Sequence, residues 1–311
     1  MSSVLAVLVP IFALILAGFL CRRSNRLGPG AASEMNKFVV WLCLPALLFK
    51  ATATSSWAVF WQPGFLAAFA GGCLLIFATT MIWRLRQRRS LPAASIDALS
   101  ASYANTGYMG IPLCLLVLGE EGLEPALIAT LVVVCMLFAI AVICIEAGLQ
   151  NERSLGRAVL TVLTALAKNP LVISPLAGAL WAATGLGLPA MALRFLDLLA
   201  AATVPCALVS LGLFLAQRQE GEAAGAWPLV IVKMVGQPLL TGFLAYRVFQ
   251  LPPLWANAAL LLSALPTGTG PFMLAEYYAR EAPVASRTIL ISTLCSLASL
   301  SACIYWIGNS A

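Results

Sequence analysis

The chain has 311 residues, of which 61% are hydrophobic and only 10% are charged, and it carries a formal net charge of +6. Its mean hydropathy is +0.96. Soluble domains are normally about a quarter charged, so this composition excludes an ordinary soluble fold and indicates an integral membrane protein. The absence of histidine excludes histidine catalysis and histidine metal sites, and the nine cysteines form no CxxC pair and are typical of small core residues.

The apolar segments predict an all-α integral membrane protein with ten transmembrane helices. A spanning helix needs about 20 mostly apolar residues. Ten stretches meet this requirement, at residues 4–21, 35–52, 63–84, 95–118, 124–147, 169–185, 195–216, 226–247, 254–278 and 284–307. The first stretch lacks a preceding basic segment and is followed by arginines, so we interpret it as a retained helix and not as a signal peptide.

Basic residues predict the orientation of these helices. Of the 18 lysines and arginines, 14 lie in the odd-numbered connections, whereas the even-numbered connections hold only Arg194 and Arg247. By the positive-inside rule the odd-numbered connections are cytoplasmic, which places both termini on the non-cytoplasmic side of the inner (plasma) membrane. Topology accounts for the basic net charge, so we expect the lipid bilayer and no nucleic acid as a partner.

The chain also matches itself at an offset of 160 residues. Four proline pairs fall into register, Pro10 with Pro170, Pro29 with Pro189, Pro45 with Pro205 and Pro92 with Pro252. Each repeat would hold five helices, and because five is odd the second repeat enters the membrane from the opposite side. We therefore predict two inverted five-helix repeats, at 1–150 and 169–311, joined by a short cytoplasmic loop at 151–168, which is a common construction among secondary transporters.

The fourth and ninth stretches contain residues that interrupt helices. Asn105–Pro112 reads NTGYMGIP and Leu265–Phe272 reads LPTGTGPF, and both place glycine and proline at mid-span. Broken helices survive in a membrane only where they face protein or a wet cavity, and their exposed N–H groups suit an anion such as a carboxylate. The predicted binding residues are Asn105, Thr106, Gly107, Gly110, Pro112, Pro266, Thr267, Gly268, Thr269, Gly270 and Pro271.

A few ionisable residues lie within or beside the apolar stretches. Glu276 and Lys233 are candidates for ion coupling or for a pair with each other, because charges inside a membrane are usually functional. For Lys233 we favour the alternative that its long side chain reaches the membrane interface. Asp97, Glu146 and Asp197 lie near helix ends, so we expect them at the interface as well.

The motifs resemble those of the auxin efflux carrier family of membrane transport proteins, and in particular its short bacterial members. The resemblance rests on NTGYMGIPL, ALPTGTGPFMLAEYY, KNPLVISPLAGALW, LVSLGLFLA and MNKFVVWLCLPALLF and covers nearly the whole chain. It implies that the fourth and ninth helices cross at their prolines, that helices 1, 2, 6 and 7 form a scaffold, and that helices 3–5 and 8–10 move as a transport domain. It also implies that Asn105 helps to hold a substrate carboxylate and that Pro112 is a crossover proline. Phe69 and Cys73 replace an acid and a lysine of plant members, which weakens the case for auxin itself.

These observations predict a secondary transporter of a small organic anion, a mono- or dicarboxylate, that works by elevator-type alternating access. No P-loop of the GxxxxGK[ST] type occurs and no nucleophile–base pair is evident, so we expect neither ATP hydrolysis nor another enzymatic activity, and no cofactor. Coupling to Na⁺ or H⁺ stays open. The alternative is a receptor or sensor that binds a carboxylate without net flux, and the resemblance suggests a homodimer through the scaffold helices.

Overall fold

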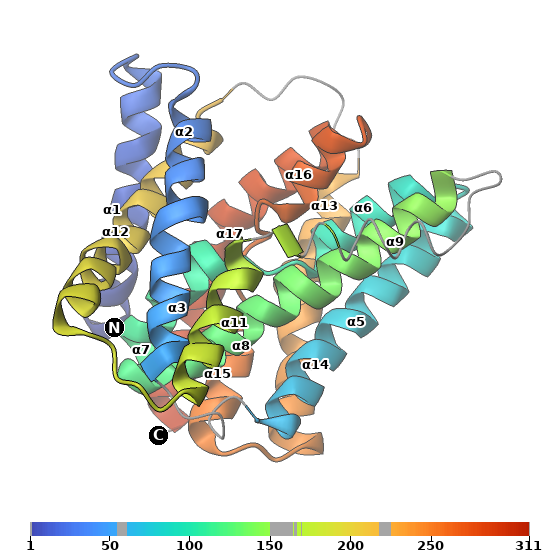
Figure 1. The fold of residues 1–311 in the computed structure, drawn as a ribbon. Coiled ribbons are helices and arrows are strands. Elements are labelled where there is room, and N and C mark those ends of the chain that lie inside the picture. Colours follow the sequence, from blue (N-terminus) through green and yellow to red (C-terminus); the bar gives the residue numbers. More distant parts are fainter. Residues whose placement is uncertain are drawn as a thin grey trace.

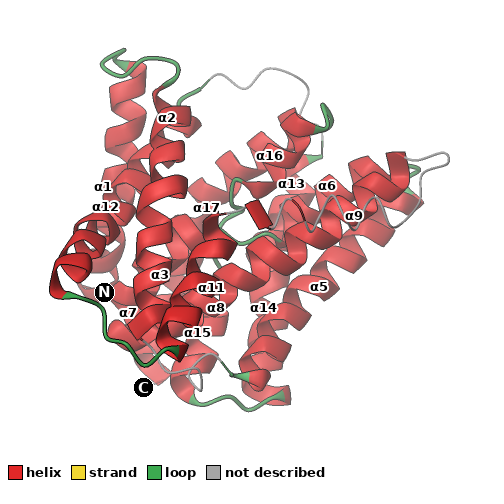
Figure 2. Ribbon diagram, viewed as in Figure 1, coloured by secondary structure: helices red, strands yellow, loops and turns green. Residues whose placement is uncertain are grey.

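The computed structural model describes residues 2–54, 61–149, 164, 167–168, 170–217 and 225–310, and every regular element in this part is a helix (Figures 1 and 2). Most of the predicted cytoplasmic loop at 151–168 lies outside the described residues. The α-helices of the first half are α1 (Ser2–Arg23), α2 (Ala31–Phe38), α3 (Leu44–Thr54), α5 (Pro63–Arg86), α6 (Leu91–Ser102), α7 (Ile111–Leu118), α8 (Leu123–Leu131) and α9 (Phe138–Leu149).

The second half continues the same helical pattern. Its α-helices are α11 (Pro170–Ala183), α12 (Ala190–Leu215), α13 (Ala226–Ile231), α14 (Gln237–Phe243), α15 (Pro253–Ser263), α16 (Gly270–Tyr277) and α17 (Ala282–Ser310). Short helical turns join several of them, namely η1 (Val39–Cys43), η2 (Thr106–Gly110), η3 (Glu120–Gly122), η4 (Val132–Leu137), η5 (Val232–Gly236) and η6 (Leu244–Val248). All of these turns except η3 are wide π-helical turns, which occur often near functional sites.

Long apolar helices confirm the prediction of an all-helical membrane protein. In the described part six helical stretches are long and apolar enough to cross a bilayer, at Ala31–Thr54, Pro63–Arg86, Glu120–Leu149, Ala190–Leu215, Ala226–Val248 and Ala282–Gly308. Three further apolar helices are shorter, at Thr106–Leu118, Val172–Ala183 and Pro253–Ser263. The number of ten spanning helices stays a prediction.

Close helix pairs on one side of the molecule depend on glycine. Helix α1 packs along α12, and α3 packs along α11 (Figure 1). A Cβ atom added to Gly18 of α1 would lie 2.2 Å from the carbonyl oxygen of Val209, and one added to Gly178 of α11 would lie 2.5 Å from the carbonyl oxygen of Phe49. Small residues therefore let the backbones approach as they do in many membrane helix pairs.

The two predicted interruptions are present, but each lies a few residues before the last proline of its motif, which is Pro112 or Pro271. Helix α6 ends at Ser102, the chain is extended at Tyr103, and the helix resumes at Thr106. Helix α15 ends at Ser263, and α16 begins at Gly270. Pro271 is the second residue of α16, where a proline removes no intrahelical hydrogen bond, whereas Pro112 lies within the continuous helical stretch Thr106–Leu118.

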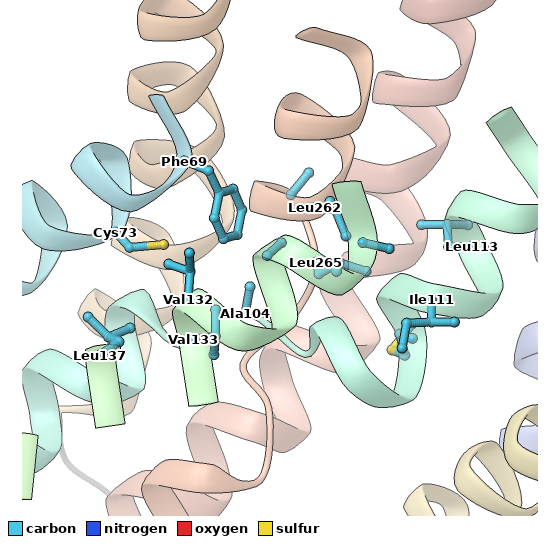
Figure 3. Packing of buried hydrophobic residues seen from close by; sticks show 14 of the residues in the cluster. Phe69, Cys73, Ala104, Ile111, Leu113, Val132, Val133, Leu137, Leu262 and Leu265 are labelled. Carbon is cyan, nitrogen blue, oxygen red and sulfur yellow. The ribbon is translucent and has the colours of Figure 1, made fainter. Parts of the chain in front are cut away.

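Apolar side chains surround both interruptions. Ala104 and Leu265, one from each interruption, are fully buried and belong to the same hydrophobic cluster as Phe69 of α5 and Val133 of η4 (Figure 3). Packing against protein, and not against lipid, is the environment in which non-helical backbone is tolerated at membrane depth.

Candidate functional site

The two interruptions lie against each other and exchange backbone hydrogen bonds. Ala104 and Thr267 form an isolated antiparallel bridge. The Asn105 N–H donates to the Pro266 carbonyl oxygen at 2.9 Å, and the Gly268 N–H donates to the Tyr103 carbonyl oxygen at 3.0 Å. Each interrupted segment thus satisfies backbone groups of the other, which the absence of water at this depth requires.

This pairing removes some of the groups that we expected to face a ligand. The N–H groups of Asn105 and Gly268 are engaged in the bridge. Thr267 is fully buried; its hydroxyl donates to the Ser100 carbonyl oxygen at 2.8 Å, and its N–H donates to Ser292 Oγ at 3.1 Å. Pro266 and Thr267 therefore hold the two segments together, and neither is among the residues that line the two cavities described below.

A small cavity lies beside the paired segments. It has a volume of about 120 Å³ and is lined by five of the predicted residues, Asn105, Thr106, Gly107, Thr269 and Gly270. The Thr106 N–H at the start of η2 donates to the Ala104 carbonyl oxygen at 2.8 Å, but the N-terminal end of a helix leaves further N–H groups without an intrahelical acceptor and favours negative charge. The cavity thus lies beside the N-terminal ends of η2 and α16 and is lined by hydroxyl and amide side chains.

Asn105 carries a buried polar group that lacks a protein partner among the described residues. Its side chain is 2% exposed, and its Nδ2 atom has no hydrogen-bond partner among the described residues. Buried polar groups are nearly always hydrogen-bonded, and the remaining cases usually mark a functional group or an unseen small molecule. Asn105 is one of the residues that line the cavity, and an unpartnered amide N–H is a suitable donor to an oxyanion.

Three other predicted residues, Gly110, Pro112 and Pro271, affect the course and packing of the backbone and do not line either cavity described here. A Cβ atom at Gly110 would lie 2.9 Å from side-chain atoms of Leu262 and Leu265, so glycine allows α15 to approach η2. Pro112 and Pro271 lie in the first turns of α7 and α16. Pro271 stands where a helix begins after its interruption, whereas Pro112 follows the π-helical turn η2.

A second cavity adjoins the first and was not predicted. It has a volume of about 210 Å³ and lies between α2, α12, η2 and α16. Tyr108 and Thr269 line both cavities, and the Tyr108 hydroxyl donates to Asn36 Oδ1 of α2. Both Asn36 and Tyr108 lie in motifs that carry the family resemblance, but nothing in the spacing shows that two residues so far apart in the chain meet.

The expectation that Lys233 reaches the membrane interface is wrong. Lys233 is fully buried, and its ammonium group donates to the carbonyl oxygens of Ser263, at 2.9 Å, and Leu265. One turn later in the same helix, Gln237 Nε2 donates to the Ser102 carbonyl oxygen at 3.0 Å. Residues four apart share a helix face, so one face donates to the C-terminal ends of both interrupted helices, α15 and α6.

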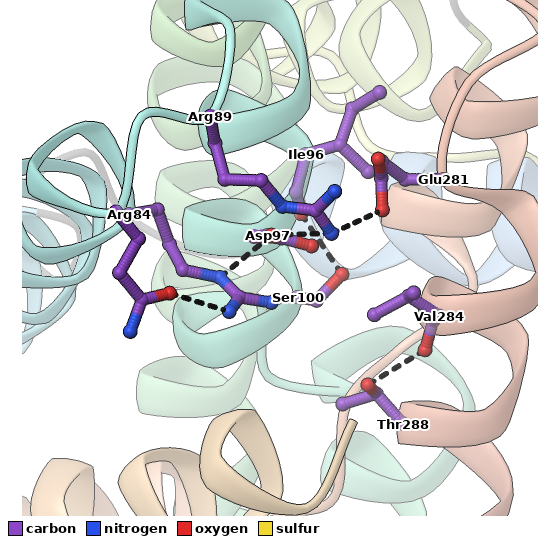
Figure 4. Close-up of polar contacts among 9 residues, drawn as sticks. Arg84, Arg89, Ile96, Asp97, Ser100, Glu281, Val284 and Thr288 are labelled. Carbon is purple, nitrogen blue, oxygen red and sulfur yellow. Dashed lines mark hydrogen bonds and ion pairs between the residues drawn. The ribbon is translucent and has the colours of Figure 1, made fainter. Parts of the chain in front are cut away.

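Asp97 is fully buried, which its expected position near a helix end did not predict. Its carboxylate accepts a hydrogen bond from Arg84 Nε at 2.7 Å, and Arg89 lies between Asp97 and Glu281 of the α16–α17 connection (Figure 4). A buried carboxylate needs such a partner. The arginines of a predicted cytoplasmic connection therefore also hold the middle of α6.

The remaining charged candidates are Asp197 and Glu276. Asp197 pairs with Lys50, and both side chains are substantially exposed, as expected for an interfacial position. The side chain of Glu276 lies outside the described part of the structure, so its suggested pairing with Lys233 stays a prediction.

Comparison with known proteins gives the family. Residues 3–304 match the family model described as "Membrane transport protein", which is the auxin efflux carrier family. The chain belongs to this family. The prediction from the motifs is thereby confirmed, and this protein is a membrane transporter and not an enzyme.

Named relatives of the transporter cover almost its full length. A protein named "Putative malonate transporter" from Rhizobium meliloti is 30% identical, over 100% of this chain and 98% of the relative. An uncharacterized transporter from Methanocaldococcus jannaschii is 25% identical, over 96% of this chain and 95% of the relative. "Auxin efflux carrier component 8" from Arabidopsis thaliana is 24% identical, over 94% of both chains.

Proposed function

We propose that this transporter carries a small organic anion, a mono- or dicarboxylate, across the plasma membrane by elevator-type alternating access. The observation that carries the proposal is the unpartnered Asn105 Nδ2 donor in the cavity beside the paired interruptions. A carboxylate oxygen is the acceptor that would satisfy it.

The chemistry of the cavity favours a small anion. Drug-sized ligands occupy pockets of roughly 300–1,000 Å³, whereas this cavity measures about 120 Å³ and suits a molecule of a few carbon atoms. Among its lining residues none is acidic, and Asn105, Thr106 and Thr269 offer donors. The relative named for malonate supports a small dicarboxylate as the first ligand to test.

Contacts between helices support the inverted repeat. The close pair Gly18–Val209 and the close pair Gly178–Phe49 are related by the predicted offset, because 18 + 160 = 178 and 49 + 160 = 209. A two-fold exchange of the halves would convert one contact into the other. In addition, a proline follows each interruption, Pro112 in α7 and Pro271 in α16. Two related halves of opposite orientation give inward and outward states of similar energy.

We place the moving boundary between two groups of helices. The scaffold consists of α1, α2, α3, α11 and α12, and the other helices form the transport domain. The second cavity lies on this boundary, and the Tyr108–Asn36 hydrogen bond crosses it. Substrate can favour the movement only if it interacts differently with the two states. A substrate that contacts both sides of this boundary in only one of the two states would supply that difference.

Uptake of radiolabelled malonate into proteoliposomes tests the proposal through Asn105→Ala. We expect uptake at low substrate to fall about tenfold or more, because a hydrogen bond to a charged group contributes about 1.5–3 kcal/mol. Asn257→Ala is the matched control, since Asn257 accepts a hydrogen bond from Tyr246 away from the cavity. Wild-type uptake by Asn105→Ala, with normal uptake by the control, would remove Asn105 from the site.

The same proteoliposomes distinguish a transporter from a receptor. A receptor would show carboxylate-dependent thermal stabilisation but no accumulation inside the vesicles, and such a result would favour the alternative of a sensor. Light scattering of the protein in nanodiscs would test the homodimer that the family resemblance implies.

A further inference from the structure

Lys233 occupies an unusual position at the end of an interrupted helix. Its ammonium nitrogen contacts two carbonyl oxygens, Ser263 of the last turn of α15 and Leu265 of the interruption. A helix that ends leaves its last carbonyl groups without partners and carries partial negative charge there. The lysine therefore neutralises a site that attracts cations.

No carboxylate among the described side chains forms an ion pair with Lys233. The group is fully buried, so water does not compensate its charge. Backbone carbonyl oxygens at the C-terminal ends of half-helices are also the groups that coordinate Na⁺ in many transporters. The Lys233 ammonium thus has the ligands that a coupling cation would use.

The corresponding place in the first half is neutral. The offset of 160 residues pairs Lys233 with Cys73 of α5, because 73 + 160 = 233. There, Gln237 Nε2 contacts Cys73 Sγ at 3.2 Å and the Ser102 carbonyl oxygen at 3.0 Å. An uncharged amide thus donates to the end of α6, while a charged ammonium donates to the end of α15.

We propose that Lys233 is a tethered cation that takes the place of a sodium ion at the end of α15, so that carboxylate transport by this protein requires no Na⁺. This inference rests on the proposed function for its transport part. Lys233 lines neither cavity described above and acts as a positioning residue: it holds the end of α15, and thereby the segment that carries Thr269. Because the cation is covalently attached, it does not dissociate with the substrate.

Thermal unfolding of the full-length protein in NaCl and in N-methylglucamine chloride of equal ionic strength tests the cation position without any substrate. We expect the same Tm in both salts for the wild type. Lys233→Ala vacates the space, so Na⁺ should raise the Tm of that variant, as binding to the folded state alone requires. Gln237→Ala is the matched control and should show no Na⁺-dependent shift, because it leaves Lys233 in place.

Malonate uptake tests the transport part. We expect wild-type uptake with and without Na⁺ to agree within about twofold, and uptake by Lys233→Met without Na⁺ to fall about tenfold or more, because two buried acceptors lose their donor. Stabilisation of the wild type by Na⁺, Na⁺-dependent wild-type uptake, or full uptake by Lys233→Met would overturn the inference. If Lys233→Ala does not fold, the wild-type comparisons and Lys233→Met decide. If the wild type transports no carboxylate, the proposed substrate class fails, whereas the Na⁺ dependence of the wild-type Tm still tests the tethered cation.

Discussion

Residues of one type have different roles in the candidate site, depending on what their polar atoms contact. Thr267 and Thr269 are two residues apart, and both were predicted to bind the anion. The Thr267 hydroxyl donates to the Ser100 carbonyl oxygen and is buried in the pairing of the two interruptions, whereas Thr269 lines both cavities. Position relative to the crossing, and not residue type, separates a structural hydroxyl from a candidate ligand group.

This difference gives a prediction for the two threonines. Thr269→Val should raise the KM for the transported carboxylate several-fold while leaving the Tm near the wild-type value. Thr267→Val should lower stability by about 1 kcal/mol, because it removes a buried hydrogen bond. Uptake kinetics and thermal unfolding of both variants measure the two effects. Equal effects on KM from both variants would contradict the assignment.

A second prediction concerns the buried ion pair between Arg84 of α5 and Asp97 of α6. Asp97→Asn leaves Arg84 buried without a charged partner, and breaking a buried ion pair typically costs about 3–5 kcal/mol. We expect a large fall in Tm for the protein in detergent. Glu34→Gln is the matched control, because its ion pair with Lys37 is largely exposed and surface pairs contribute little. Similar Tm values for both variants would show that the buried pair does not stabilise the fold.

At the scale of the helix, local composition determines where the two helices are interrupted, and tertiary contacts stabilise the interrupted segments. Glycine and proline weaken the fourth and ninth stretches, as the sequence predicts. The freed backbone groups find partners only because the two segments meet at Ala104 and Thr267, and because Lys233 and Gln237 donate to the carbonyl ends of α15 and α6. The interrupted helices therefore depend on α13–α14 as much as on each other.

Helix contacts through glycine give a prediction at this scale. Gly178→Val should destabilise the protein by about 1–3 kcal/mol or more, because a Cβ atom there would lie 2.1 Å from Thr52 Oγ1 and 2.5 Å from the Phe49 carbonyl oxygen. Gly308→Val is the control, since a Cβ atom at Gly308 has no neighbour within 4 Å. A Tm comparison checks this, and an unchanged Tm for Gly178→Val would mean that α3 and α11 can separate without loss.

For the whole molecule, charge and hydropathy define the relation to the membrane. The basic residues lie mainly in alternate connections, and the described helices include six that are long and apolar enough to span. Figure 1 marks both termini toward the lower end of the molecule and shows the α1–α2 connection at the upper end. This arrangement is consistent with the proposed even number of crossings and with termini on one side.

Reporter fusions test this orientation. Alkaline phosphatase fused to the C-terminus should be active and green fluorescent protein at the same position dark, because the positive-inside rule places the C-terminus outside the cytoplasm. Fusions truncated after Arg88 should show the opposite pattern, since that basic connection is predicted to be cytoplasmic. A fluorescent C-terminal fusion would contradict the proposed topology.

The amino-acid sequence alone determined the membrane character, the positions of the helical stretches, the two interruptions and the family. Each of these follows from local composition or from motifs, which a linear chain displays directly. Asn105, Thr106, Gly107, Thr269 and Gly270 were predicted as binding residues, and they do line one cavity.

Only the tertiary structure decided which polar groups remain available and where the buried charges lie. Thr267 is engaged by Ser100, 167 residues away in sequence, and Lys233 is buried because α15 ends against it. The free energy of a polar group in a membrane protein depends on whether a partner is within hydrogen-bond distance. That partner comes from distant parts of the chain, so no local pattern could have distinguished Thr267 from Thr269 or an interfacial lysine from a buried one.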